Sequence, residues 1–201
     1  MNNKRFSPRN MAMIGMLSAI SFILMFLEFS IPIMPSFIKL DLSELPALIG
    51  AFAYGPVAGV MIEFCKILIK LVLKPSSTAF VGELANFSIS CMLVLPASVI
   101  YLFKKSRKQA ILGTVVGTLI MTAFGSCFNA IYLLPKFSEL YGIPLDAIIG
   151  MGTAINPAIH SISGLVLMCV VPLNLLKGGL VSLITILVYK KLSPILKAAH
   201  K

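Results

Sequence analysis

Charged residues are scarce in this chain, and their scarcity sets its class. Only 12% of the 201 residues are Asp, Glu, Lys or Arg, whereas a soluble domain carries about 25%. Hydrophobic residues make up 58% of the chain, and the mean hydropathy is +0.98. A soluble domain is therefore excluded, and we predict an all-α integral membrane protein in which residues 1–201 form a single membrane-embedded domain.

Several motifs of catalysis and metal binding are also missing. The chain has no G-x-x-x-x-G-K-[ST] phosphate loop, no H-E-x-x-H pair and no G-x-S-x-G elbow, so ATP hydrolysis through a phosphate loop is excluded. The four cysteines lie in apolar runs without a C-x-x-C pair, which argues against a metal site or a disulfide framework. We therefore predict no catalytic residue and no metal.

Long apolar runs, interrupted by proline, glycine and charge, predict six membrane-crossing helices. A span needs about 20 apolar residues. The predicted helices cover residues 9–29, 43–53, 56–73, 81–103, 109–134 and 172–193. Residues 30–43 are expected to form a loop, and residues 135–157 a mixed segment with a short helix at 145–154. Because the second and third helices are short, four spans with a re-entrant hairpin are the alternative.

The basic residues indicate the orientation of the chain. Three precede the first span, four lie in residues 104–108 and four follow Tyr189, which accounts for eleven of the seventeen Lys and Arg residues and for none of the seven acidic ones. Cytoplasmic segments of membrane proteins are enriched in Lys and Arg. Both termini are therefore expected in the cytoplasm. The formal net charge of +10 has the same origin, so it does not indicate nucleic acid as a partner.

The stretch PLNLLKGG, which begins at Pro172, places polar groups inside an apolar run. Asn174 and Lys177 are three positions apart and share one face of a helix. A lysine within a span costs about 3 kcal/mol and normally faces a cavity or a partner, which favours a polar ligand site over a lysine that snorkels to the interface. Asn129 is a further ligand candidate, because an amide donates and accepts without the cost of burying a charge.

Other polar and aromatic residues have simpler explanations. Glu63 and Lys66 are three apart on the third helix, so an internal ion pair is expected there, and Glu83 is expected to neutralise a lysine. Small residues at Ala12, Gly15 and Ala19 would let another helix approach the first one closely. Aromatic side chains that could present a face to a planar ligand, although each is more simply explained by packing, are Phe37, Phe80, Phe87, Tyr132 and Phe137.

Four stretches carry a resemblance to a known family. They are KLDLSELPALIG from Lys39, YGPVAG from Tyr54, GELANF from Gly82 and PLNLLKG from Pro172. Together they resemble the substrate-binding S-components of energy-coupling factor (ECF) vitamin transporters, most closely the riboflavin-binding members. The resemblance implies a six-helix bundle whose outward-facing vitamin site is covered by the loop after the first helix. It assigns Asn129, Asn174 and Lys177 to the ligand, and Leu40, Leu42 and Ala47 to its cover.

The same resemblance implies binding and delivery without catalysis. Riboflavin would be the transported ligand, and no cofactor is expected. The implied partners are a transmembrane T-component, which docks on Ala12, Gly15 and Ala19, two ATPase subunits and the lipid of a bacterial cell membrane that the chain crosses several times. Two alternatives stay open: an S-component for another vitamin such as pantothenate or for a flavin nucleotide, and a small membrane enzyme that uses Glu63, Glu83 or His160.

Overall fold

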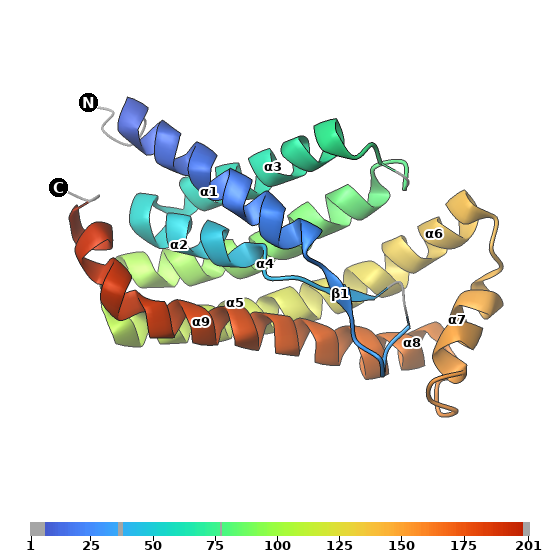
Figure 1. The fold of residues 1–201 in the computed structure, drawn as a ribbon. Coiled ribbons are helices and arrows are strands. Elements are labelled where there is room, and N and C mark those ends of the chain that lie inside the picture. The colour runs from blue at the N-terminus through green and yellow to red at the C-terminus, as the bar shows by residue number, and fades with distance from the viewer. Residues whose placement is uncertain (1–6, 36–37, 77, 199–201) are drawn as a thin grey trace.

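The computed structural model describes residues 7–35, 38–76 and 78–198, with side chains as far as Val188. It is a bundle of long helices with one short β-hairpin (Figure 1). The helices are α1 Pro8–Phe26, α2 Glu44–Tyr54, α3 Pro56–Leu73, α4 Val81–Phe103, α5 Arg107–Phe128, α6 Leu134–Tyr141, α7 Leu145–Thr153, α8 Ile162–Leu165 and α9 Val171–Ala198. Two π-helical segments are continuous with them, η2 Asn129–Leu133 and η3 Val166–Val170.

The two ends of the bundle differ in character. The start of α1 and the end of α9 lie at the same end, together with the connections from α2 to α3 and from α4 to α5 (Figure 1). The opposite end carries the hairpin of β1 (Phe29–Ser30) and β2 (Lys39–Leu40), the loop after α3, and helices α6, α7 and α8. The basic residues of 104–108 therefore lie at the first end, as the charge pattern predicts.

Four helical stretches in the described part of the chain are long and apolar enough to cross a membrane. They are Pro8–Phe26, Val81–Phe103, Arg107–Tyr141 and Ile162–Val188. Helix α3 has 18 residues but carries Glu63, Lys66 and Lys70, and α2 has only 11 residues. The helical character of the chain is thus confirmed, with four candidate membrane spans in the described residues. The predicted count of six spans depends on whether α2 and α3 also cross the membrane, and it stays a prediction.

Two predicted helix ends are wrong, and proline explains both. The fifth helix was expected to end at residue 134 and the last to begin at 172, because proline lacks an N–H and normally ends a helix. In the structure the fifth helix continues through Pro135 to Tyr141, and the last begins at Ile162, ten residues before Pro172. Each proline follows a π-helical turn, in which Leu134 N–H donates to Asn129 O and Val171 N–H to Val166 O.

Buried apolar side chains form clusters at the hairpin end and deeper in the bundle. At the hairpin end, Leu40 of β2 packs with Leu134, Leu165 and Leu173 from α6, α8 and α9. Deeper in the bundle, a second cluster joins residues of α2, α4, α5 and α9, among them Phe52, whose ring centroid lies 4.5 Å from that of Tyr101. The hairpin is therefore packed onto the ends of the C-terminal helices by its own apolar side chains.

Glycines bring α4 and α5 into direct backbone contact. A Cβ added at Gly113 would lie 2.5 Å from the carbonyl oxygen of Ala97, and one added at Gly117 would lie 2.6 Å from that of Leu93. Small residues four apart permit this approach in membrane helices, where close van der Waals packing drives association. The two helices therefore form a fixed wall for the space beside them.

Candidate functional site

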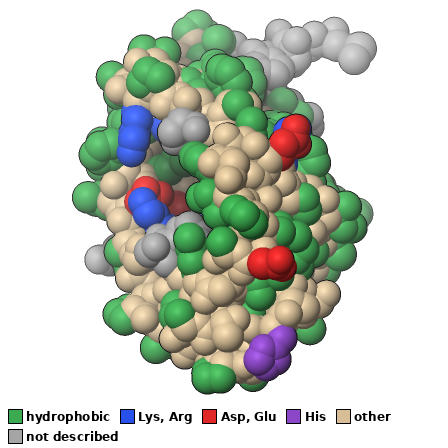
Figure 2. Space-filling model, turned by 90° about the vertical axis from the view of Figure 1, so that its right-hand side faces the viewer, with side chains coloured by type: hydrophobic (Ala, Val, Ile, Leu, Met, Phe, Trp, Pro, Cys, Tyr) green, Lys and Arg blue, Asp and Glu red, His purple; other side chains and the backbone are tan. Residues whose placement is uncertain are grey.

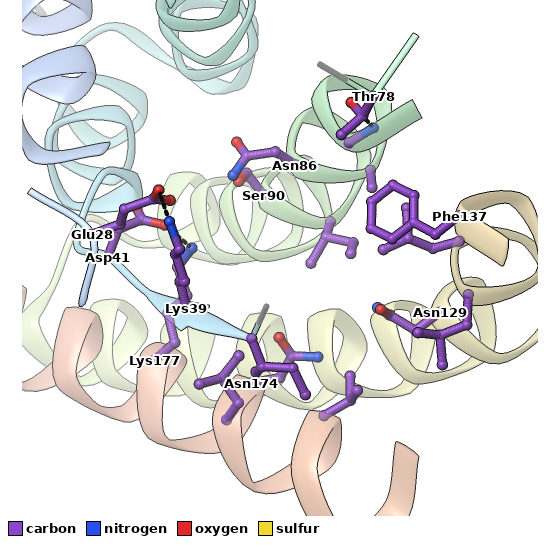
Figure 3. Close-up of a pocket in the computed structure, with 18 of the residues that line it drawn as sticks. Glu28, Lys39, Asp41, Thr78, Asn86, Ser90, Asn129, Phe137, Asn174 and Lys177 are labelled. Carbon is purple, nitrogen blue, oxygen red and sulfur yellow. Dashed lines mark hydrogen bonds and ion pairs between the residues drawn. The ribbon is translucent and has the colours of Figure 1, made fainter. Parts of the chain in front are cut away.

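A cavity of about 620 Å³ opens at the hairpin end of the bundle. Figure 2 looks onto this end and shows acidic and basic side chains in and beside a hollow, with further acidic side chains elsewhere on a face of hydrophobic and other residues. The wall is built by the end of α1, the β2 segment, the start of α2, the end of α3 with the loop after it, α4, η2 with α6, α7, and η3 with α9 (Figure 3). Sites for small organic ligands typically measure about 300–1,000 Å³, so this cavity has the size of such a site.

Lys177 of α9 lies at the inner wall of the cavity and contacts two carboxylates. Its Nζ is 3.0 Å from Asp41 Oδ2 and 2.7 Å from Glu44 Oε1. Ser90 Oγ of α4 donates a hydrogen bond of 2.7 Å to the same Glu44 oxygen. All four side chains are buried. One lysine thus connects α9 to the segment after β2, to the start of α2 and, through Glu44, to α4.

A second ion pair continues this network into the bundle. Lys66 Nζ lies 2.5 Å from Glu63 Oε2, and both side chains are completely buried. Lys66 also donates a hydrogen bond of 3.0 Å to Ser43 Oγ, and the Ser43 N–H donates one of 2.8 Å to Asp41 Oδ1. The hydroxyl of Ser43 is therefore occupied by Lys66 and does not cap α2.

Asp41 is held in its charged form by this arrangement. Burial raises the pKa of its carboxyl, but the ammonium groups of Lys177 and Lys66 and the hydrogen bonds from Ser43 outweigh burial and lower the pKa from 3.8 to about 2. A buried charge is tolerated only when it is paired and hydrogen-bonded. The segment after β2 is thereby fixed to α9 and α3 at any physiological pH.

Two asparagines approach the cavity from neighbouring helices. Asn129 begins η2, and its Nδ2 donates a hydrogen bond of 2.7 Å to Gly125 O, one turn earlier. Asn174 lies three residues before Lys177 on α9; it is buried, and its Nδ2 has no hydrogen-bond partner. A Cβ at Gly125 would lie 2.9 Å from that nitrogen. The absence of a side chain at Gly125 therefore makes room for Asn174.

The two π-helical segments place these residues at the cavity wall. Segments η2 and η3 each end two residues before a proline, and Asn129, Leu133 and Val170 from them line the cavity. A π-helical turn inserts one extra residue and turns the following side chains to new directions, and such turns occur often at functional sites. The sequence signal was the pair of prolines, Pro135 and Pro172, inside otherwise continuous apolar runs.

The structure brings together three of the predicted ligand residues and places the predicted cover elsewhere. Asn129, Asn174 and Lys177 all line the cavity, as Figure 3 shows. Leu40 packs in the outer apolar cluster, Leu42 packs against the inner one, and Ala47 is fully buried on α2; none of the three is among the described residues that line the cavity.

Of the predicted aromatic and small residues, one lines the cavity and the other described ones do not. Among the aromatic candidates, Phe137 lines the cavity, whereas Phe80, Phe87 and Tyr132 do not, and Phe37 lies outside the described residues. The small residues Ala12, Gly15 and Ala19 are exposed on α1 and are not among the described residues that line the cavity, and a Cβ at Gly15 would meet nothing within 4 Å.

Several residues of the site were not predicted as ligand contacts. Asn86 and Ser90 line the cavity from α4 (Figure 3), and Glu44 lines it from α2. Their spacing of four, in an apolar helix, was the available signal for Asn86 and Ser90. At the mouth, Lys39 Nζ lies 2.6 Å from Glu28 Oε1, and Lys70 pairs with Glu83, which also accepts hydrogen bonds from Ser76 and Thr78. Within the described ranges, no group of three or more His, Cys, Asp or Glu residues could hold a metal ion.

A family model and two curated relatives agree on the kind of protein that this chain resembles. The family described as "ECF transporter, substrate-specific component" matches residues 9–189. The riboflavin transporter RibU of Staphylococcus aureus (strain TCH60) is 34% identical over 184 residues, which cover 92% of this chain and 90% of the relative. The riboflavin transporter FmnP of Bacillus subtilis (strain 168) is 31% identical over 189 residues, or 92% and 93% of the two chains.

A solved structure agrees with these sequence relatives. It is described as the structure and mechanism of the S component of a bacterial ECF transporter. Its chain superposes on this one with a TM-score of 0.72 at 34% sequence identity, and the match covers 94% of this chain and 98% of that chain. The fold of this chain thus has an experimental counterpart over nearly its whole length.

Proposed function

Because this chain belongs to the family of ECF transporter substrate-specific components, we propose that it is the riboflavin-binding subunit of such a transporter. It would capture riboflavin from outside a bacterial cell and deliver it together with an energising module. The relatives at 34% and 31% identity, both named riboflavin transporters, support this assignment of the ligand.

The observation that carries the proposal is the charge balance of the cavity. Its described lining contains three carboxylates, Glu28, Asp41 and Glu44, and three lysines, Lys39, Lys70 and Lys177, so their formal charges cancel. Most of the remaining lining is apolar, with a few amides and hydroxyls. An uncharged, largely flat ligand that carries polar groups at its edges matches this surface, and riboflavin is such a molecule. The same balance disfavours a flavin nucleotide, whose phosphate would add uncompensated negative charge.

In the proposed complex, Asn129, Asn174 and Lys177 contact the flavin ring. The orphaned Nδ2 of Asn174 and the ammonium of Lys177 are donors that suit the carbonyl oxygens and ring nitrogens of a flavin. Phe137 offers a flat apolar face. Backbone and apolar groups around Leu40, Leu42 and Ala47 would help to cover the ring.

We further propose six spans, formed by α1 to α5 and α9, with both termini in the cytoplasm. The shared end of the two termini and the basic residues at 104–108 support this orientation. The short α2 and the charged α3 would cross together, with Glu63 and Lys66 neutralised inside the bundle. The cavity then faces the outside, where riboflavin must enter.

The energising partners are proposed to be a transmembrane T-component and two ATPase subunits. In α1, only 17% of the most apolar 18-residue window is buried inside the protein, against 39–50% in the other three candidate spans. Helix α1 is therefore the candidate span with most surface left for a partner or lipid. The exposed Ala12, Gly15 and Ala19 would form the docking face, since small residues permit close helix approach. No enzymatic step is proposed for this chain.

The absorption spectrum of the detergent-purified full chain tests the ligand. If the proposal is right, protein produced in riboflavin-containing medium carries a yellow flavin spectrum that is lost on denaturation and extraction. A folded protein that neither retains nor rebinds a flavin, but binds a different vitamin, would overturn the assignment. Turnover of a substrate by the isolated chain would instead favour an enzyme.

A further inference from the structure

Four basic side chains lie in the short connection between α4 and α5, and all four are exposed. We call them the basic loop: Lys104, Lys105, Arg107 and Lys108. Within the part of the chain that the structure describes, none of the four forms an ion pair. Of the seven acidic residues of the chain, Glu63 is buried against Lys66, and the other six lie towards the hairpin end (Figure 1). The basic loop therefore has no carboxylate of its own chain to balance it.

Lysines at the hairpin end are arranged differently. Three of them, on β2, α3 and α6, each form an ion pair with a carboxylate; the pairs are Lys39 with Glu28, Lys70 with Glu83 and Lys136 with Glu139. The enrichment of Lys and Arg in cytoplasmic segments explains why basic residues stand at the other end, but it does not say what neutralises them. At one end the protein supplies the counter-charge, and at the other end a partner from outside the chain must supply it.

Exposed apolar side chains flank the basic loop on both helices. Phe103, directly before Lys104, is 81% exposed, and Val99, one turn earlier on α4, is exposed as well. Leu112 is exposed on the second turn of α5. Exposed apolar surface beside charge marks a site of contact with a membrane or a partner. A phospholipid has acyl chains next to a charged headgroup, so both parts of an anionic phospholipid meet matching side chains here.

The backbone at the start of α5 adds to the positive charge. Gln109 N–H donates a hydrogen bond of 3.3 Å to Ser106 Oγ, and Ala110 N–H donates one of 3.0 Å to Ser106 O. The first N–H groups of a helix have no acceptor within the helix, so those of Arg107 and Lys108 point to an acceptor outside it. Phosphate groups are bound by such N–H groups at helix N-termini. The side chains and the backbone of this segment thus favour the same kind of anion.

We propose that the basic loop binds the headgroups of anionic phospholipids in the membrane leaflet that borders it. Clusters of about four or more Lys and Arg residues next to a membrane span bind anionic lipid, and each residue strengthens the attraction severalfold. The inference goes beyond the proposed function, because it concerns a surface at the other end of the bundle from the cavity and holds for any ligand in that cavity.

Tryptophan fluorescence tests the proposal, because the chain contains no tryptophan of its own. Phe103→Trp places a reporter beside the basic loop. Ile131→Trp is the matched control, since Ile131 is also an exposed apolar residue, on η2 next to α6 at the hairpin end. Each full-length variant is reconstituted into phosphatidylcholine vesicles. A rising fraction of the lipid is then replaced by phosphatidylcholine or by phosphatidylglycerol with brominated acyl chains. Bromine quenches tryptophan on contact, so the two quenching curves give the relative association constants of the two lipids.

We expect the Phe103→Trp reporter to prefer phosphatidylglycerol at least about fivefold at about 0.1 M salt, and to lose most of this preference at about 1 M salt through screening. Replacing all four basic residues of the loop by Gln in the same background should abolish the preference, and Ile131→Trp should show none. Both leaflets carry the same lipids, so the orientation of the chain in the vesicle does not affect the result.

Equal association constants for the two lipids at the Phe103→Trp reporter would overturn the proposal and leave the basic loop to an acidic protein partner. A preference that survives the fourfold replacement, or an equal preference at Ile131→Trp, would overturn it as well. If the fourfold variant does not reconstitute as a monodisperse protein, Lys104→Gln with Lys105→Gln takes its place. An unchanged preference in that variant would contradict the proposal, and a reduced one would support it.

Discussion

Lys177 Nζ and Asp41 Oδ2 lie 3.0 Å apart although their residues are 136 positions apart in the chain. The contact joins the last long helix to the segment that follows β2, at the inner wall of the cavity. Because Lys177 also contacts Glu44 at 2.7 Å, it has a structural task in addition to the proposed contact with the ligand. Experiments on Lys177 must therefore separate its effect on stability from its effect on ligand binding.

Lys177→Ala is expected to lower both riboflavin affinity and stability. The substitution leaves Asp41 and Glu44 buried without their cation, and breaking a buried pair from one side costs about 3–5 kcal/mol. The triple variant Lys177→Met, Asp41→Asn, Glu44→Gln removes the stranded charges, so its thermal unfolding in detergent should return towards wild type while its affinity stays low. Recovery of affinity in the triple variant would show that Lys177 acts only on the fold.

The ion pair of Asp41 should be insensitive to pH over the physiological range. Its folded pKa is depressed from 3.8 to about 2, so the stability it adds is complete above pH 3.8 and is lost as the pH falls towards about 2. We expect the difference in unfolding temperature between wild type and Asp41→Asn to be constant from about pH 8 to about pH 5. A difference that disappears near neutral pH would mean that Asp41 is not held as a charged partner of Lys177.

Gly125→Ala should weaken riboflavin binding without unfolding the protein. The new Cβ would lie 2.9 Å from Asn174 Nδ2 and 3.4 Å from Ile89, so the amide must move, whereas alanine is the better helix former by about 1 kcal/mol. Gly179→Ala on α9 is the matched control, because its Cβ meets nothing within 4 Å. We expect a loss of affinity of about tenfold for the first variant only. Equal affinity in both would remove Asn174 from the site.

Bulky residues on α1 should separate binding from transport. Gly15→Trp with Ala19→Trp alters an exposed face and should block the close helix approach that a T-component needs. Riboflavin affinity should stay normal while cellular uptake and pull-down of the T-component are lost. Val115→Trp with Leu119→Trp is the control, since both residues are exposed on α5 at the same spacing. Normal uptake in the α1 variant, or equal loss of binding and uptake, would contradict the docking role.

Relationships that are local in the chain could be predicted from the sequence. Apolar length gave the long spans, and the spacing of three put Glu63 beside Lys66, which the structure joins at 2.5 Å. The ends of the helices could not be predicted in the same way. Pro135 and Pro172 were interpreted as boundaries, but π-helical turns before them shift the hydrogen bonds and let both helices continue.

Relationships across the bundle were beyond the sequence pattern. Nothing in local spacing indicates that Asp41 pairs with Lys177 or that Ser90 of α4 contacts Glu44 of α2. The cavity wall on α4 was missed for the same reason, since Asn86 is recognised as part of a site only once α4 is seen opposite Asn174. The shared face of Asn174 and Lys177, by contrast, followed from their spacing on one helix.

The central claim is that this chain binds riboflavin in the cavity bordered by Asn129 and Asn174. Titration of ligand-free, detergent-purified wild-type chain and of Asn129→Ala with Asn174→Ala, followed by quenching of flavin fluorescence, tests it most directly. We predict saturable binding of one riboflavin per wild-type chain, and an affinity at least about tenfold weaker in the double variant. No saturable binding by the folded wild-type chain, or the same affinity in the folded double variant, would contradict the claim.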